Sequence, residues 1–234
     1  MTTDCLANPI WHALTGEQSR HALGQGIGSG GARRFDPAIG PLAAVREPSP
    51  ECLADLGTLV REIGLLGLMQ EGGGTHEVPG AHVLRQALGV QMVYAAERPP
   101  EVIGSEAPVM ALSADDYPDM LALATLTEPG PFAARTGDLG EFFGVREAGR
   151  LIAMAGQRLR PPGHVEVSAV CTHPQARGRR LAPLLMAQVI AAILAEGRRP
   201  MLHSYADNAH ALALYARLGF VESRRVTLTL YAPD

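Results

Sequence analysis

The stretch VSAVCTHPQARGRRLA, residues 167–182, joins an alternating run of apolar residues to a cluster of arginines around one glycine. Arg177, Arg179 and Arg180 form this cluster, and no acidic residue occurs from Val167 to Ala195. Such concentrated positive charge, in a chain of net charge −4, indicates a local anion site. The alternative is a solvated basic surface at the entrance of a helix, where most short arginine runs lie.

The residues on either side of the cluster predict a strand followed by a long helix. Residues 164–172 alternate apolar and polar side chains, as strands do, and Leu181–Glu196 is apolar enough to form a buried helix. The first turn of a helix has amide groups without intrahelical partners and carries the positive end of the helix dipole. Gly178 allows the backbone to approach a ligand closely, so a phosphate group could bind at this turn.

A second stretch, DNAHALALYARLGF at residues 207–220, predicts another helix. Asn208, Ala211 and Tyr215 are spaced by three and four residues, and about 100° of rotation per residue places them on one helical face. Taken singly, Asn208 is an ordinary helix N-cap and Tyr215 an ordinary core aromatic whose hydroxyl finds a partner. The two stretches are informative only together.

Together they resemble the coenzyme A-binding segment and the asparagine–tyrosine helix of the GCN5-related N-acetyltransferase (GNAT) superfamily, most closely its FR47-like branch. The resemblance covers about residues 107–234. It implies an α/β (α+β) fold with a mixed central sheet flanked by helices. In this fold the fourth and fifth strands splay apart to admit the pantetheine arm of coenzyme A.

The resemblance also implies acetyl-CoA as the co-substrate and assigns roles to individual residues. Backbone groups of the strand from Val170 to Thr172 would hold the pantetheine and the acetyl carbonyl, Asn208 would support the arm, and Tyr215 would be the general acid at sulfur. The residues implied for cofactor binding are Val170, Cys171, Thr172, Arg177, Gly178, Arg179, Arg180, Leu181, Ala182, Asn208 and Ala211.

One position departs from the family pattern. The pattern is Arg/Gln-x-x-Gly-x-Gly/Ala, and residues 177–182 read RGRRLA, with Arg180 at the usual central glycine. A side chain there must point away from the bound diphosphate, or its guanidinium must replace a backbone contact. Weaker cofactor binding is one consequence that the sequence leaves open.

A general base is harder to find in the sequence. Glu166, Ser168 and Val170 share one face of the strand, and Glu166 lies ~13 Å from Val170 at ~3.3 Å per residue. That distance requires a bulge or a water relay if Glu166 is to act as the base, and a solvated strand carboxylate is an equal alternative. Phe142 and Phe143 are candidates for the acceptor pocket, but neighbours in a strand face opposite sides, so at most one of them lines it.

Other candidate ligands have ordinary explanations. His203, in a predicted strand at 200–206, could shape the acceptor pocket, whereas a surface or core histidine is the commoner case. The histidines and the three isolated cysteines show no metal-ligand spacing, so we expect no metal.

The acidic balance of the chain, with a pI near 6.1, argues against a nucleic-acid role. No apolar stretch is long enough to cross a bilayer, and we expect a cytoplasmic protein without a membrane partner. Both a monomer and a homodimer stay open.

Two regions follow from the pattern of turns and linkers. The proline-rich run at 97–109 separates an N-terminal α/β region, 1–104, from the GNAT-like region, 105–234. The first region predicts a strand, a helix, a strand and a strand. This order permits, without establishing, a degenerate copy of the second region. The second region predicts the order β, α, βββ, αβαβ.

The leading hypothesis is an acetyl-CoA-dependent N-acetyltransferase in which the amine of a small molecule or amino-acid derivative attacks the thioester directly. One alternative is a non-catalytic acyl-CoA-binding or regulatory module, suggested by Arg180 and the N-terminal half. The other is transfer to a protein or peptide amine.

Overall fold

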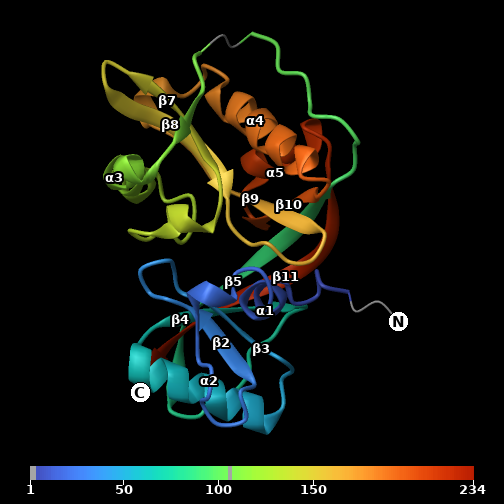
Figure 1. Cartoon of the computed structure of the whole chain (residues 1–234). Coiled ribbons are helices and arrows are strands. Elements are labelled where there is room, and N and C mark those ends of the chain that lie inside the picture. The colour runs from blue at the N-terminus through green and yellow to red at the C-terminus, as the bar shows by residue number, and fades with distance from the viewer. Residues whose placement is uncertain (1–3, 105–106) are drawn as a thin grey trace.

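The structure, a computed structural model, describes residues 4–104 and 107–234. Their strands form one mixed sheet in the order β1-β2-β3-β4-β11-β5-β10-β9-β8-β7-β6, with helices packed against it (Figure 1), which confirms the predicted fold class. The N-terminal elements are α1 (Pro9–Thr15), β1 (Ala22–Leu23), β2 (Ala32–Phe35), β3 (Leu42–Val45), α2 (Pro50–Ile63), β4 (Leu66–Glu71) and β5 (Ala81–Tyr94). The later elements are β6 (Met110–Leu112), α3 (Tyr117–Thr127), β7 (Phe142–Glu147), β8 (Arg150–Gln157), β9 (His164–Thr172), α4 (Leu181–Ala195), β10 (Arg199–Tyr205), α5 (Ala209–Arg217) and β11 (Phe220–Pro233).

The predicted meander is present as β7, β8 and β9, which pair antiparallel. Helix α4 follows and packs across β7, β8 and β9. It is apolar on most of its surface, and its buried side chains are Leu181, Leu185, Met186, Val189, Ile190 and Ile193. These side chains pack against apolar residues of the strands in the largest hydrophobic cluster. Their burial therefore holds α4 against the sheet.

Strands β9 and β10 lie parallel but pair only at their beginnings. The paired residues are His164 with Arg199, Val165 with Pro200 and Glu166 with Met201. No further residue pair joins these two strands to each other. Beyond Glu166 the two strands separate, as the predicted splay requires. Ala169 has φ 52° at a register shift between β8 and β9, so β9 also contains a bulge at this point.

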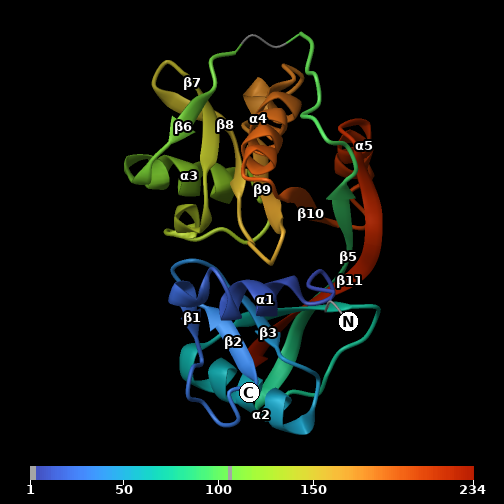
Figure 2. The ribbon, with the colours of Figure 1, turned by 45° about the vertical axis from the view of Figure 1, so that its right-hand side comes forward.

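Two long strands connect the halves of the molecule. Strand β5 pairs with β11 along most of its length and with β10 through residues 89–93. Strand β11 in turn pairs with β4 through residues 226–231. The last strand of each half is therefore inserted into the sheet beside the other half, and Figure 2 shows both strands running between the two lobes.

The sheet order has an internal correspondence around the β5–β11 pair. On one side, β9, α4 and β10 form a parallel β-α-β unit whose second strand pairs with β5. On the other side, β3, α2 and β4 form a parallel β-α-β unit whose second strand pairs with β11. Each parallel pair is short, with two residue pairs joining β3 to β4.

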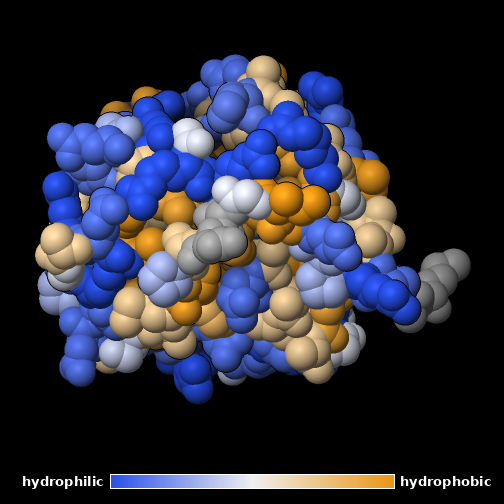
Figure 3. All heavy atoms as spheres, turned by 90° about the horizontal axis from the view of Figure 1, so that it is seen from above, coloured by the Kyte–Doolittle hydropathy of each residue, from blue (hydrophilic) through white to orange (hydrophobic). Residues whose placement is uncertain are grey.

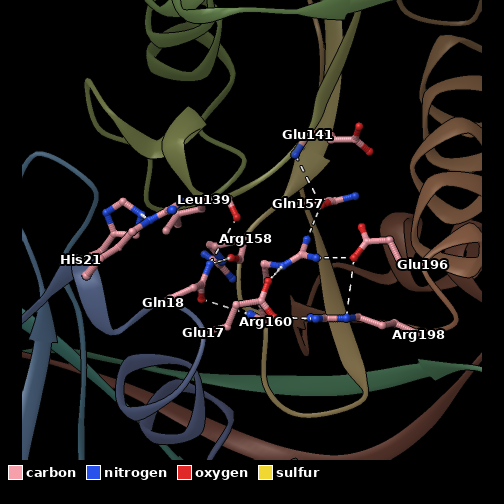
Figure 4. A network of polar contacts seen from close by, with 11 residues as sticks. Glu17, Gln18, His21, Leu139, Glu141, Gln157, Arg158, Arg160, Glu196 and Arg198 are labelled. Carbon is pink, nitrogen blue, oxygen red and sulfur yellow. Dashed lines mark hydrogen bonds and ion pairs between the residues drawn. The ribbon is translucent and has the colours of Figure 1, made fainter.

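A polar network locks the N-terminal half against the β8–β9 hairpin (Figure 4). The Nε2 of Gln18 donates to the carbonyl oxygen of Arg158 at 2.6 Å, and its Oε1 accepts from the amide of Arg160 at 3.1 Å. Glu17 pairs with Arg160 at 2.5 Å and with Arg198 at 2.6 Å. Because Gln18 is buried, these bonds form away from bulk water and fix the hairpin relative to α1.

The face that lies above α4 and β7 carries mainly hydrophilic residues, with smaller hydrophobic areas between them (Figure 3). Within residues 4–104 and 107–234, no helix has both the length and the apolar character needed to span a bilayer.

Candidate active site

A cavity of ≈ 250 Å³ opens where β9 and β10 separate. Residues 167–170 of β9 and residues 203–205 of β10 form two of its walls, immediately beyond the last paired residues of these strands. Backbone groups on the facing edges of the strands therefore have no strand partner and are free to bind a ligand. The other lining residues are Leu42, Met69, Ala87, Gly89, Thr127, Glu128, Pro129, Gly130, Pro131, Arg158, Asn208, Ala211, Tyr215, Val226 and Leu228.

Helix α5 presents the predicted face to this cavity. Asn208, Ala211 and Tyr215 all line it, so the structure brings together the three residues that helical spacing placed on one side. Asn208 is also the N-cap, because its Oδ1 accepts from the amide of Ala211 at 3.1 Å. Its Nδ2 group makes no hydrogen bond to a described residue and is available to a ligand.

Tyr215 has the surroundings of a proton donor. Its ring packs edge-on against Phe220, with ring centroids 6.4 Å apart. Burial raises the pKa of the phenol above its ordinary value of 10.0, because the charged phenolate is disfavoured away from water. The hydroxyl therefore stays protonated throughout the neutral range.

The N-terminus of α4 is open to an anion. No described side chain caps it and its first turn has no acidic residue, so its first amides lack partners within the protein. Gly178, just before the helix, has φ 80° and open space where a Cβ would lie. Leu181 is buried in the core by its side chain, so it and Ala182 can contribute only their backbone to an anion here.

Arg180, at the family's glycine position, has φ 57° and ψ 27°. This left-handed conformation explains why glycine suits the position. The guanidinium points away from the helix, and its Nη1 donates to the carbonyl oxygen of Ile103 at 2.8 Å. Gly104 has no side chain to obstruct this contact, since a Cβ there would lie 3.0 Å from Nη1. This contact gives the Arg180 guanidinium a partner within the protein.

The other two arginines differ in their partners. Arg179 forms two hydrogen bonds of 3.1 Å with the carboxylate of Glu147, on the exposed surface. Arg177 is exposed, and its side chain makes no hydrogen bond or ion pair with a described residue. Arg177 is therefore the arginine of the cluster best able to reach an added phosphate.

Coenzyme A fits the groups that the chain leaves unsatisfied. The Oγ1 of Thr172, at the end of β9, is buried without a partner. Along the chain, Thr172 lies between the cavity-lining residues 167–170 of β9 and the open N-terminus of α4. Val170 lines the cavity, whereas the Cys171 side chain is buried in a separate hydrophobic cluster, which raises the pKa of its thiol to about 11. Cys171 therefore offers only its backbone.

Glu166 does not have the surroundings of a general base. Its side chain is 0% exposed and receives hydrogen bonds from Nε and Nη2 of Arg158 at 2.8 and 2.7 Å. Arg158, together with a 2.7 Å contact to His203, holds the pKa of this buried carboxyl well below its ordinary value of 4.5. A carboxylate so strongly stabilised is a weak base, and none of its side chain is exposed. These surroundings argue against Glu166 as the group that removes the amine proton.

His203 lines the cavity as expected, but both of its ring nitrogens are occupied. Nδ1 contacts Glu166, and Nε2 lies 3.1 Å from Nε2 of Gln91, which also donates to the carbonyl oxygen of Leu6. These two contacts hold the imidazole ring in place at the cavity wall.

Phe142 and Phe143 do not line this cavity. Phe142 is buried in the cluster beneath α3, against Phe132, and Phe143 packs toward the α4 side of the sheet. The pair does face opposite sides, as strand geometry requires. Both sides are filled by packed elements at this end of β7, so the expected acceptor-pocket role is wrong for both residues.

Several lining residues carried no signal in the sequence. Glu128 follows α3 in the left-handed conformation, φ 49°, and is the only carboxylate among the described lining residues. Leu42 and Met69 come from the N-terminal half, and Leu228 from the last strand. Their positions depend on the exchange of β5 and β11 between the halves, which no local pattern encodes.

Comparisons with known proteins agree with this geometry. A family model described as FR47-like protein matches residues 142–228. A solved GNAT-family structure from Novosphingobium aromaticivorans is 42% identical, covers 98% of both chains and superposes with a TM-score of 0.86. The chain belongs to the GNAT family. The FR47-like match runs from β7 into β11 and so includes β9, α4, β10 and α5.

More distant GNAT structures share the fold. A GCN5-related N-acetyltransferase from Kribbella flavida is 18% identical, with a TM-score of 0.60 over 98% of this chain and 96% of that one. A tandem GNAT protein of the clavulanic acid biosynthesis pathway is 16% identical, with a TM-score of 0.52 over 85% and 77% of the chains. A comparison with curated proteins found no match.

No cluster of three or more histidine, cysteine or acidic residues that could hold a metal occurs in the described part of this GNAT chain.

Proposed function

We propose that this protein transfers the acetyl group of acetyl-CoA to the amine of a small molecule or amino-acid derivative. The observation that carries the proposal is the position of the cavity. It opens between the splayed β9 and β10 and faces Asn208 and Tyr215 of α5, and the chain continues from its β9 wall through residues 171–180 to the uncapped N-terminus of α4. One ligand with a thioester arm and a diphosphate would contact all three features.

The residues of the chain supply binding and proton transfer. Acetyl-CoA, when bound, supplies an activated acetyl carbonyl. The α4 amides and Arg177 would hold the diphosphate, and backbone groups near Val170 would orient the arm and stabilise charge on the carbonyl oxygen. As the amine nitrogen bonds to the carbonyl carbon, the carbon–sulfur bond breaks and Tyr215 donates its proton to sulfur. The amine proton leaves to water or to Glu128, the one carboxylate at the cavity.

The test is release of free thiol from acetyl-CoA in the presence of a broad amine library. The proposal expects thiol release that depends on the amine, together with an acetylated product identified by mass spectrometry. Coenzyme A binding without thiol release from any amine would instead support a non-catalytic acyl-CoA-binding module.

We also propose that the N-terminal region, 1–104, is a degenerate copy of the GNAT unit in 105–234. The corresponding β3-α2-β4 and β9-α4-β10 units, and the mutual insertion of β5 and β11, support this duplication. A hollow of ≈ 500 Å³ lies beside β3 and β4, at the position that corresponds to the active-site cavity. This hollow is the larger of the two, but the features that suit it to coenzyme A are missing.

In the N-terminal copy, the groups that would bind a diphosphate and a pantetheine arm already have partners within the protein. The α2 helix is capped by Ser49, whose Oγ accepts from the amide of Cys52, and Glu51 places a negative charge in its first turn. At the end of β3, the carbonyl oxygen of Val45 already accepts from Nδ2 of Asn8 at 2.8 Å. The chain would therefore bind one coenzyme A, through its C-terminal copy.

A further inference from the structure

Arg158 is the one arginine among the residues that line the active-site cavity. It follows directly after β8, and its side chain is 12% exposed. Its backbone is fixed on both sides, because the amide donates to the carbonyl oxygen of Glu166 at 2.9 Å and its own carbonyl accepts from Gln18. A guanidinium held in this way loses little conformational entropy when it binds a ligand.

Only one edge of this guanidinium is used within the protein. Nε and Nη2 donate to the two oxygens of Glu166, while Nη1 makes no hydrogen bond within residues 4–104 and 107–234. Arginine has five N–H donors in a planar fork, so the hydrogens on Nη1 and the second hydrogen on Nη2 remain. This end-on edge has the geometry that binds a carboxylate through two parallel bonds.

The other residues that line the cavity indicate what else such a ligand contains. Leu42, Met69 and Leu228 give it an apolar wall, and Glu128 offers a negative charge that suits an amine. Glu166 is the only carboxylate that forms an ion pair with Arg158 within the described residues. The cavity thus combines one cationic edge, one anionic side chain and an apolar surface.

We propose that the amine acceptor is an amino acid with an apolar side chain, whose carboxylate is bound by the Nη1 and Nη2 edge of Arg158. This inference rests on the acetyltransferase function proposed above and names its substrate class. Residues outside the coenzyme A motifs would recognise the acceptor: Arg158 would bind the carboxylate, and Leu42, Met69 and Leu228 would contact the side chain. Because two of these residues belong to the N-terminal half, that half would contribute directly to acceptor specificity.

The experiment compares acceptors that differ only at the carboxylate. Thiol release is measured with L-leucine, with L-leucinamide and with 3-methylbutylamine, and the first pair is repeated for L-methionine. The expected kcat/KM for each amino acid is at least about 50-fold above that of its amide or amine, the usual effect of losing a charge-assisted bidentate contact. Calorimetry on the enzyme saturated with coenzyme A should show heat with L-leucine and none with 3-methylbutylamine.

Arg158→Lys tests the residue itself. Lysine keeps the charge that Glu166 needs but lacks the planar fork, so the preference for L-leucine over L-leucinamide should fall below about fivefold. Arg160→Lys is the matched control, because Arg160 pairs with Glu17 and Glu196 and does not line the cavity. It should keep the preference. The thermal midpoint and the coenzyme A affinity of both variants establish that they are folded.

The failures are distinguishable. Equal rates with L-leucine and L-leucinamide, or acetylation confined to amines without a carboxylate, would overturn the inference and leave the acetyltransferase function intact. An unchanged preference in Arg158→Lys would also overturn it. Absence of thiol release with every amine in the library would remove the proposed function, and the inference with it.

Discussion

Tyr215 and Glu166 are both catalytic candidates by residue type, but their surroundings in the structure differ. The phenol lines the cavity and burial raises its pKa, so it stays protonated, as the proposed proton transfer to sulfur requires. The carboxylate is sealed between Arg158 and His203. Residue type and spacing made both plausible, whereas burial and hydrogen-bond partners make only Tyr215 suitable for proton transfer to a substrate.

Tyr215→Phe should lower kcat by about 100-fold, the usual contribution of a general acid. The affinity for coenzyme A should stay within about twofold of the wild type, because the ring and its packing on Phe220 remain. Steady-state thiol release and calorimetry measure the two quantities. Unchanged turnover would remove the hydroxyl from the mechanism.

Glu166→Gln should destabilise the protein by about 3–5 kcal/mol at pH 7.5, because it leaves Arg158 buried without its counter-charge. The effect should depend on pH. The folded-state pKa of Glu166 lies below the ordinary value of 4.5, so its stabilisation is complete above that value and is lost as the pH falls below it. Urea unfolding at pH 7.5 and 4.0 should therefore show a smaller difference between wild type and variant at pH 4.0.

Glu147→Gln is the matched control for this stability measurement. Glu147 pairs with Arg179 on the surface, with 59% of its side chain exposed, and its loss should cost less than about 1 kcal/mol at either pH. A cost for Glu166→Gln as small as that of the control would contradict the role of Glu166 in fixing Arg158.

Among the helices and strands, α4 matters most for the proposed binding of coenzyme A, because its N-terminus is open. Its exposed amides and Gly178 were predicted from the sequence, whereas the direction of the Arg180 side chain was not. That direction depends on Ile103, which lies 77 residues away in the chain and accepts the Arg180 hydrogen bond. Arg180 therefore fastens the loop before α4 to the segment that joins the two halves.

A pair of substitutions at Arg180 tests the charge at this helix end. Asparagine and aspartate both tolerate the left-handed conformation and have nearly the same shape. Arg180→Asn should change the affinity for coenzyme A by less than about threefold, because the arginine side chain points away from the helix. Arg180→Asp should weaken it by at least about tenfold, since a carboxylate would occupy the N-terminus that the diphosphate needs. Equal affinities of the two variants, measured by calorimetry, would show that the diphosphate binds elsewhere.

Several helices and strands follow closely from local sequence, whereas α1, β1 and β2 had no predicted counterpart. The alternation in 164–172 predicted β9 with its bounds, and the apolar run with Gly197 after it predicted α4 to within one residue. The bulge at Ala169 was not predictable, because alanine has no preference for the φ of 52° that it adopts there. Pairing with β8 imposes that conformation on it.

At the scale of the whole molecule, the two halves complete each other. The segment 220–232 was predicted as one or two closing strands, and it lies in a single strand, β11, which reaches from the C-terminal half to β4. Between β11 and β10 lies β5, from the N-terminal half. The site residues Leu42 and Met69 escaped prediction for this reason, since they meet the cavity only through pairings between distant segments.

A fragment of residues 105–234 should not fold alone. Without β5, strands β10 and β11 would each lose a partner, and apolar residues such as Tyr94 and Val90 would be missing from the main hydrophobic cluster. Expressed alone, the fragment should be insoluble or fail to bind coenzyme A, and co-expression with 1–104 should restore both properties. A fragment that binds coenzyme A as tightly as the whole chain would contradict the interdependence of the halves.

The central claim is that the open N-terminus of α4 binds the diphosphate of coenzyme A and so directs the thioester into the cavity between β9 and β10. Calorimetric titration of the whole protein with coenzyme A, and with pantetheine, which lacks the diphosphate, tests this most directly. We expect saturable binding of coenzyme A, and binding of pantetheine that is at least about 100-fold weaker. Equal affinities for the two ligands, or no heat with millimolar coenzyme A, would contradict it.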